Sequence, residues 1–202
     1  VSGYYKDGND VGIFGRSSFL IFIVVLGIES ARQTVARLKK GRRVEELEQF
    51  ALNDSMTGMY NRNAYDYFVK NEKDFEGYVI VTFDLNNLKQ CNDQYGHRAG
   101  DEYIINAAHI IEDNFERYGK CYRIGGDEFC CIIPKGRYFK IERVMHKIDQ
   151  DVEILNHKNI IPVPVGIAYG YAVFTADDTD PEKVRERADE DMYRNKKAMK
   201  QS

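Results

Sequence analysis

Acidic residues stand at two places where the sequence predicts that a strand ends. Asp84 closes an apolar, β-branched run, and Asp127 and Glu128 follow the Gly-Gly pair of a predicted hairpin. Carboxylates beside substrate phosphates are the ligands that Mg²⁺ prefers. If the hairpin lies beside the first strand, the three acids converge, and repulsion of about 4 kcal/mol per pair at roughly 4 Å and an effective dielectric of about 20 favours a metal site. The alternative is that Asp127 and Glu128 form a solvated turn.

Basic side chains near these acids are candidates for phosphate binding. Lys89 lies five residues after Asp84, Arg123 precedes the hairpin glycines, and Lys196 and Lys200 are four residues apart on the predicted last helix. A spacing of four places both lysines on one face of that helix. The alternative for each lysine is an ordinary surface side chain.

Asn92 and Asp101 have the chemistry to read the edge of a purine base. An amide offers a donor and an acceptor, and a carboxylate accepts from the N1–H and exocyclic amine that guanine has and adenine lacks. The structural alternatives are a turn former at Asn92 and a helix cap at Asp101.

The elements that position these residues follow from the hydrophobic pattern. From about residue 52, helical and strand patterns alternate, which predicts a mixed sheet flanked by helices. A polar segment at 85–100 separates the first strand from a helix with Ile104, Ala108, Ile111 and Phe115 on one stripe. The other predicted helices are 61–70, about 138–156 and 181–200, and the predicted strands are 78–84, 121–124, 129–134 and 162–173.

The first 50 residues differ in character from the rest of the chain. The apolar run 19–28 is ten residues long, short of the roughly 20 that a bilayer span needs, yet the basic residues after it are typical of the cytoplasmic end of a span. Two alternatives stay open: the last part of a transmembrane helix, or a soluble helix that docks on something outside this chain. Farther along, a 3-4 apolar spacing predicts a connecting helix that pairs with its twin.

Composition excludes several classes of protein. Of 202 residues, 43% are hydrophobic, which excludes a disordered tail, and 29 Lys and Arg against 32 Asp and Glu argue against a nucleic-acid binder. The four cysteines have no C-x-x-C spacing, which favours reduced core thiols in a cytosolic domain. Because the chain begins with Val and no basic leader, we expect it to be a piece of a longer protein.

Four segments carry a resemblance to a known family. The stretch RIGGDEF at 123–129 contains the signature of the GGDEF family, the diguanylate cyclases. In the family's order, DSMTGMYNR at 54–62, DLNNLKQCNDQYGHRAGD at 84–101 and ADEDMYRNK at 188–196 resemble its other motifs. The resemblance implies an α/β (α+β) nucleotidyl-cyclase palm, with a mainly antiparallel central sheet, flanking helices and the GGDEF hairpin at the active site. It covers residues 51–202, so residues 1–50 are expected to form an N-terminal connector with a connecting helix.

The resemblance also implies a role for each candidate residue. Asp84, the Leu85 carbonyl and Asp127 would hold two Mg²⁺ or Mn²⁺ ions per active site, with Glu128 assisting the metals and the catalytic arrangement. Asn92 and Asp101 would recognise guanine, and Gly125 and Gly126 would let the backbone approach the nucleotide closely. The lysines that would hold the triphosphate are Lys89, which also belongs to the expected catalytic group, Lys196 and Lys200.

The implied activity is a diguanylate cyclase that condenses two GTP into cyclic di-GMP and pyrophosphate across a homodimer. A catalytically silent module that binds GTP to regulate a partner is the alternative. A cyclase that accepts ATP is a third hypothesis, but a carboxylate such as Asp101 facing adenine N1 would lack a donor. We expect an upstream sensor, no nucleic-acid partner, and a cytoplasmic catalytic domain, tethered to the inner face of the membrane if the apolar run spans it.

Several positions depart from the family pattern. Asn86 replaces the usual second Asp, Asn87 stands where an aromatic residue is frequent, and Lys200 stands where Arg is frequent. Many members carry an R-x-x-D product-binding site, but here those two positions are Glu116 and Gly119. We therefore expect tuned activity and no product inhibition through that site.

Overall fold

The computed structural model describes residues 26–33, 35, 51–136 and 140–199. The chain divides into two units, Val1–Gln49 and Phe50–Ser202, and each is described by itself. In the first unit, residues 26–33 and 35 are helical, with Leu26, Ile28 and Val35 exposed. None of the described helices is both long enough and apolar enough to cross a bilayer. Most of the apolar run at 19–28 lies outside the described residues, so both alternatives for it stay predictions, as does the connector.

The second unit is built on a sheet of four strands: β1 (Val79–Asn86), β2 (Lys120–Arg123), β3 (Glu128–Ile133) and β4 (Gly166–Val173). Their order is β2-β3-β1-β4, and each pair of neighbours is antiparallel. The mixed sheet predicted from the alternation of helices and strands is therefore wrong, because β1 lies between two strands that both run opposite to it. The mainly antiparallel sheet that the resemblance implied is confirmed.

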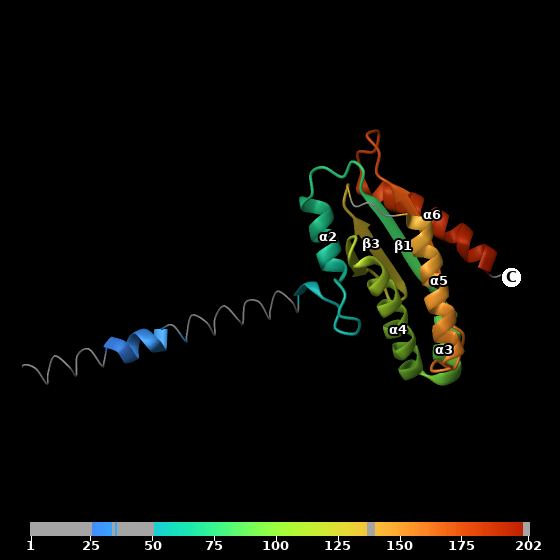
Figure 1. Ribbon diagram of the computed structural model, residues 1–202, viewed down its shortest axis with the longest axis horizontal. Coiled ribbons are helices and arrows are strands. Elements are labelled where there is room, and N and C mark those ends of the chain that lie inside the picture. The colour runs from blue at the N-terminus through green and yellow to red at the C-terminus, as the bar shows by residue number, and fades with distance from the viewer. Residues whose placement is uncertain (1–25, 34, 36–50, 137–139, 200–202) are drawn as a thin grey trace, which may run out of the picture. The chain divides into compact units, whose positions relative to one another are not determined.

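Helices cover both faces of this sheet (Figure 1). On one face, α4 (His97–Phe115) and α5 (Ile141–His157) pack against Val81 and Phe83 of β1. On the other, α2 (Arg62–Asn71) and α6 (Pro181–Met199) pack around Ile80. Because alternate side chains of β1 are buried on opposite faces, the strand reads as one continuous apolar run. All four cysteines are buried free thiols, as expected of core residues.

The segment after β1 differs from the predicted polar loop. It folds into a short helix, α3 (Leu88–Tyr95), and α4 then begins at His97. Asn87 precedes α3 with φ 63°, a left-handed conformation that Asn tolerates better than most residues. Gly96, with φ 82°, joins the two helices. Only Leu88 and Cys91 of α3 are buried, so the polar composition hid the helix.

Candidate active site

Pairing between β1 and β3 brings the acidic residues to one end of the sheet. In this register Asp84 lies directly opposite Glu128. The Leu85 amide donates a hydrogen bond of 3.1 Å to the Asp127 carbonyl oxygen. The hairpin therefore lies beside the first strand, which is the condition on which the predicted convergence of acids depended.

The hairpin that joins β2 to β3 closes on Glu128. The amides of Ile124 and Gly125 donate to the Glu128 carbonyl oxygen at 3.0 and 3.2 Å. Neither Gly125 nor Gly126 has a positive φ, so the backbone conformation does not require glycine. A β-carbon at position 125 would lie 2.9 Å from Glu128 Oε2, whereas one at 126 would meet nothing within 4 Å. Glycine at 125 therefore leaves room for the Glu128 carboxylate.

Arg123 fastens the hairpin to the turn that precedes α2. One guanidinium nitrogen lies 3.0 Å from Asp54 Oδ1, and another donates to the Gly126 carbonyl oxygen at 2.8 Å. The same Asp54 oxygen accepts from the Thr57 amide and hydroxyl. Burial would raise the pKa of Asp54, but hydrogen bonds from Thr57 and Arg123 outweigh it and hold the pKa below its usual 3.8. The guanidinium of Arg123, a phosphate-ligand candidate by sequence, thus already bonds to Asp54, Met56 and Gly126 within the fold.

Lys196 reaches from α6 to the end of β1. Its Nζ lies 2.5 Å from Asp84 Oδ1, and the two side chains are 26% and 16% exposed. This ion pair joins two residues that the sequence analysis assigned to different ligands, the phosphate and the metal. Lys89 lies exposed on α3, and Lys200 lies outside the described residues.

The donor set at this end of the sheet fits a hard divalent cation. The carboxylates of Asp84, Asp127 and Glu128 and the Leu85 carbonyl supply only oxygen, which Mg²⁺ prefers. Across the described ranges, however, no three His, Cys, Asp or Glu side chains are gathered in a metal-binding cluster. Backbone pairing brings the acids to neighbouring strand ends, while the Asp84 carboxylate is turned to Lys196.

The two candidate guanine-reading residues lie on consecutive helices. Asn92 lies inside α3, and Asp101 lies inside α4, whose N-cap is Gly96. Asn92 is therefore not a turn former, and Asp101 is not a helix cap, which were their structural alternatives. Their helices pack together so that the Asn92 side chain lies against Gly100, the residue before Asp101.

Tyr103, which the sequence analysis did not single out, ties α4 to two strands beside the acids. Its hydroxyl donates to the Asn86 carbonyl oxygen at 2.5 Å and accepts from the Gly166 amide at 2.7 Å. Burial raises the pKa of Tyr103 to about 12, so the hydroxyl keeps its proton for this bond. Its place four residues before Ala107, which is buried on the inward side of α4, is a periodicity that could have indicated it.

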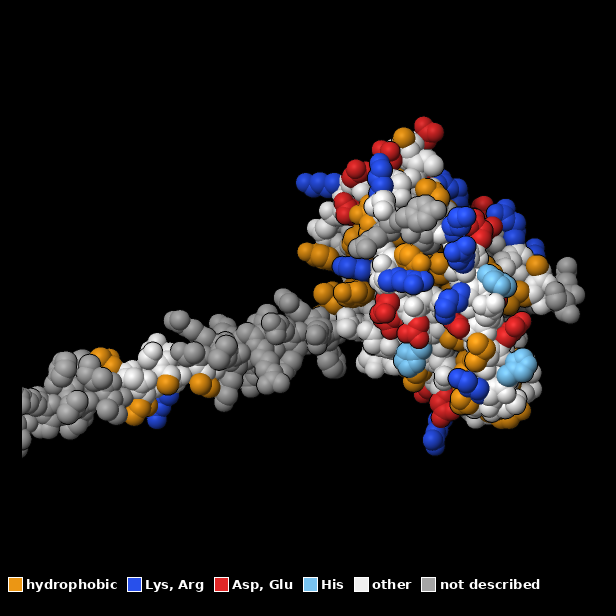
Figure 2. All heavy atoms as spheres, in the orientation of Figure 1, with side chains coloured by type: hydrophobic (Ala, Val, Ile, Leu, Met, Phe, Trp, Pro, Cys, Tyr) orange, Lys and Arg blue, Asp and Glu red, His pale blue; other side chains and the backbone are white. Residues whose placement is uncertain are grey.

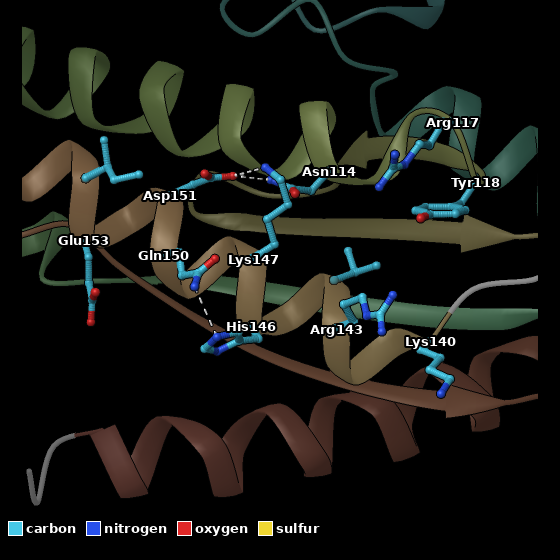
Figure 3. Close-up of a pocket in the computed structure, with 12 residues that line it drawn as sticks. Asn114, Arg117, Tyr118, Lys140, Arg143, His146, Lys147, Gln150, Asp151 and Glu153 are labelled. Carbon is cyan, nitrogen blue, oxygen red and sulfur yellow. Dashed lines mark hydrogen bonds and ion pairs between the residues drawn. The ribbon is translucent and has the colours of Figure 1, made fainter.

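A separate cavity of about 860 Å³ lies between α5 and the end of α4. Basic side chains gather on this face (Figure 2). In Figure 3, Arg117 and Tyr118 stand at one end of the cavity, and Asp151 accepts hydrogen bonds from Asn114 and Lys147. None of the predicted catalytic, nucleotide-binding or metal-binding residues is among those that line it.

The two positions of the missing R-x-x-D site flank Arg117 and Tyr118 in the chain, and do not themselves line this cavity. Glu116 is exposed just after α4, and Gly119 precedes β2. A β-carbon at position 119 would lie 2.9 Å from the Ile132 carbonyl carbon. Because backbone cannot yield as a flexible side chain does, an Asp does not fit here without a shift of β3.

A family model described as "Diguanylate cyclase, GGDEF domain" matches residues 51–202. The chain is 31% identical over 147 residues to the bifunctional diguanylate cyclase/cyclic di-GMP phosphodiesterase MucR of Pseudomonas aeruginosa, covering 68% of this chain and 22% of MucR. It is 28% identical over 158 residues to the diguanylate cyclase DgcS of Shewanella oneidensis, covering 75% of this chain and 52% of DgcS. The chain thus spans from about a fifth to about half of these relatives.

A solved structure shares the fold. The coiled coil and GGDEF domain of DgcB from Caulobacter crescentus, solved in complex with c-di-GMP, matches with a TM-score of 0.70. The match covers 86% of this chain and 95% of that one at 23% identity, and at this identity the likeness concerns the fold alone.

Proposed function

The chain belongs to the GGDEF family of diguanylate cyclases, and we propose that it condenses two GTP molecules into cyclic di-GMP with release of pyrophosphate. The observation that carries this proposal is the pairing of β1 with the GGDEF hairpin. It sets Asp84 opposite Glu128 and bonds Leu85 to Asp127, and this supports the proposal because oxygen donors at one strand end are what a phosphoryl-transfer site needs.

We assign the metal ligands to that strand end. Asp84, the Leu85 carbonyl and Asp127 would hold the cations, and Glu128 would assist them. Two Mg²⁺ or Mn²⁺ ions held by these residues would lower the pKa of the attacking 3′-hydroxyl and neutralise charge on the phosphoryl oxygens.

The remaining residues bind and orient the nucleotide. Lys196 is assigned to the triphosphate because its ammonium group already lies beside Asp84, and Lys89 and Lys200 are assigned with it. Asn92 and Asp101 would hydrogen-bond guanine. Gly125 and Gly126 would let the hairpin backbone approach the nucleotide. The chemistry then needs little beyond positioning and charge compensation.

Catalysis is proposed to need two copies of this chain. Each copy binds one GTP, and the 3′-hydroxyl of one nucleotide attacks the α-phosphate of the other. Two such attacks close the ring and expel two pyrophosphates. The connector at 1–50 would bring the two copies together, under the control of an upstream sensor and, if its apolar run spans a bilayer, at the inner face of the membrane.

The test is incubation of the purified 202-residue chain with GTP and Mg²⁺, followed by chromatography of the products. We expect cyclic di-GMP and pyrophosphate. If GTP binds but is recovered unchanged, the chain is instead a silent GTP-binding module. Equal conversion of ATP would overturn the assignment of Asp101 to guanine.

A further inference from the structure

Gly100 occupies a helical position whose backbone does not need glycine. It lies buried in the second turn of α4 and is not among the residues with a positive φ. Glycine in a helix interior costs about 1 kcal/mol relative to alanine. Because backbone conformation does not require glycine there, a contact with a neighbouring residue must explain why a side chain is absent.

That contact is the side chain of Asn92. The three nearest atoms that a β-carbon at position 100 would meet all belong to it. The added carbon would overlap Asn92 Oδ1 and would lie 2.8 Å from Cγ and 3.1 Å from Nδ2. The Asn92 amide therefore rests in the space that the missing side chain leaves.

Packing alone holds this amide. Among the residues that the structure describes, none hydrogen-bonds to the Asn92 side chain, although its backbone carbonyl accepts from the Gly96 amide. An amide with an uncommitted donor and acceptor, held against Gly100, suits an edge of a base that presents both kinds of group.

We propose that Gly100 is a positioning residue for guanine recognition, because the space left by its missing side chain holds the Asn92 amide against the residue that precedes Asp101. The inference rests on the proposed function, in which these two residues read guanine. It predicts that a methyl group at position 100 changes recognition and not folding. The atoms it would displace are the far end of a side chain, which can rotate away, and Ala favours the helix.

The experiment measures binding of 3′-deoxy-GTP, which lacks the attacking hydroxyl and is not converted, to the full chain by calorimetry with Mg²⁺. The variants are Gly100→Ala, Asn92→Ala and the double variant, and 3′-deoxy-ATP is the reference ligand. Glu102→Ala, on the exposed side of α4, is the matched control and should leave the Kd within about twofold.

We expect Gly100→Ala to raise the Kd for 3′-deoxy-GTP about three- to tenfold, as for the loss of one hydrogen bond, with 3′-deoxy-ATP unchanged. Its melting temperature should equal or exceed that of the wild type. In the Asn92→Ala background, Gly100→Ala should have no further effect, because the side chain that it displaces is gone.

Two results would overturn this inference alone. One is an unchanged Kd in Gly100→Ala when Asn92→Ala raises it, and the other is an equal effect of Gly100→Ala with and without Asn92. If Asn92→Ala itself leaves the Kd unchanged, the guanine-reading role in the proposed function fails and this inference fails with it. A lowered melting temperature in Gly100→Ala would also overturn the inference, because it would mean that the glycine is needed for the stability of the fold.

Discussion

Asp84 has a cation and a carboxylate as its neighbours. Lys196 approaches it from α6, and Glu128 stands opposite it on β3. The lysine offsets part of the repulsion that carboxylates at neighbouring strand ends would otherwise feel. The Lys196 ammonium group can therefore keep the acidic residues close together before a substrate binds. A metal ion that binds Asp84 must then compete with this ion pair.

Asp127 provides the sharpest single-residue test of the metal assignment. Asp127→Asn keeps the shape and removes the charge, so we expect turnover to fall at least about 100-fold, or ~2.7 kcal/mol of barrier. Steady-state rates of cyclic di-GMP formation measure the change. Asp113→Asn, an exposed change on α4, is the control, and wild-type rates in Asp127→Asn would mean that the metal site lies elsewhere.

Asp101 should determine which base is accepted. Its carboxylate is assigned to the N1–H and amine of guanine, so Asp101→Ala is expected to reduce the preference for GTP over ATP about tenfold or more. Competition between the two nucleotides in one binding assay measures this ratio. An unchanged ratio would remove Asp101 from base recognition.

Residues whose side chains are charged and regularly spaced could be predicted from the sequence as site candidates. Acids after strands and paired lysines could be read from type and spacing, but the partners of Arg123 could not. The bond to the Gly126 carbonyl lies within the hairpin, but Asp54 lies 69 residues before Arg123, so only the fold reveals that ion pair. The Asp84–Lys196 pair was hidden for the same reason.

Among the elements, α4 is linked to strands β1 and β4 by the hydrogen bonds of the Tyr103 hydroxyl. Tyr103→Phe would leave the Asn86 carbonyl and the Gly166 amide without their shared partner. We expect a loss of about 1–3 kcal/mol in the free energy of unfolding, because buried polar groups without partners are costly. Urea denaturation measures it, and Tyr95→Phe, at an exposed tyrosine, is the control. Equal stability of Tyr103→Phe and wild type would contradict this role.

The link between the hairpin and Asp54 should depend on pH. The pKa of Asp54 in the folded chain lies below its usual 3.8, so its charge stabilises the fold above that value. This contribution is lost as the pH falls through the folded pKa. Asp54→Asn should therefore be less stable than wild type at pH 7, with the difference shrinking below about pH 4. Urea denaturation at several pH values measures it, and a difference that does not change with pH would contradict the assignment.

The arrangement of elements was only partly predictable. Long periodic segments such as α5 and α6 were found nearly to their ends, because their apolar stripes are strong. The pairing of β2 with β3 was predicted from the Gly-Gly hairpin and is confirmed. The other pairings were not predicted, since the alternation of helices and strands does not say which strands meet. The helix α3 was missed because two buried residues are too few to make a periodic pattern.

At the scale of the whole molecule, the chain presents one set of site residues for a reaction that joins two nucleotides. Residues 51–202 match the GGDEF domain, and MucR and DgcS are both much longer than the segments that match this chain. The proposed chemistry is therefore an encounter between two copies, and the product records whether both attacks occurred. A single attack would leave a linear dinucleotide and release one pyrophosphate.

The stoichiometry of the reaction is the sharpest test of the proposed cyclase activity. Pyrophosphate and cyclic di-GMP are measured together while the full chain consumes GTP with Mg²⁺. We predict two pyrophosphates released for each cyclic di-GMP, with neither formed above background by Asp127→Asn. Pyrophosphate without cyclic di-GMP, or bound GTP that is never consumed, would contradict the proposed activity.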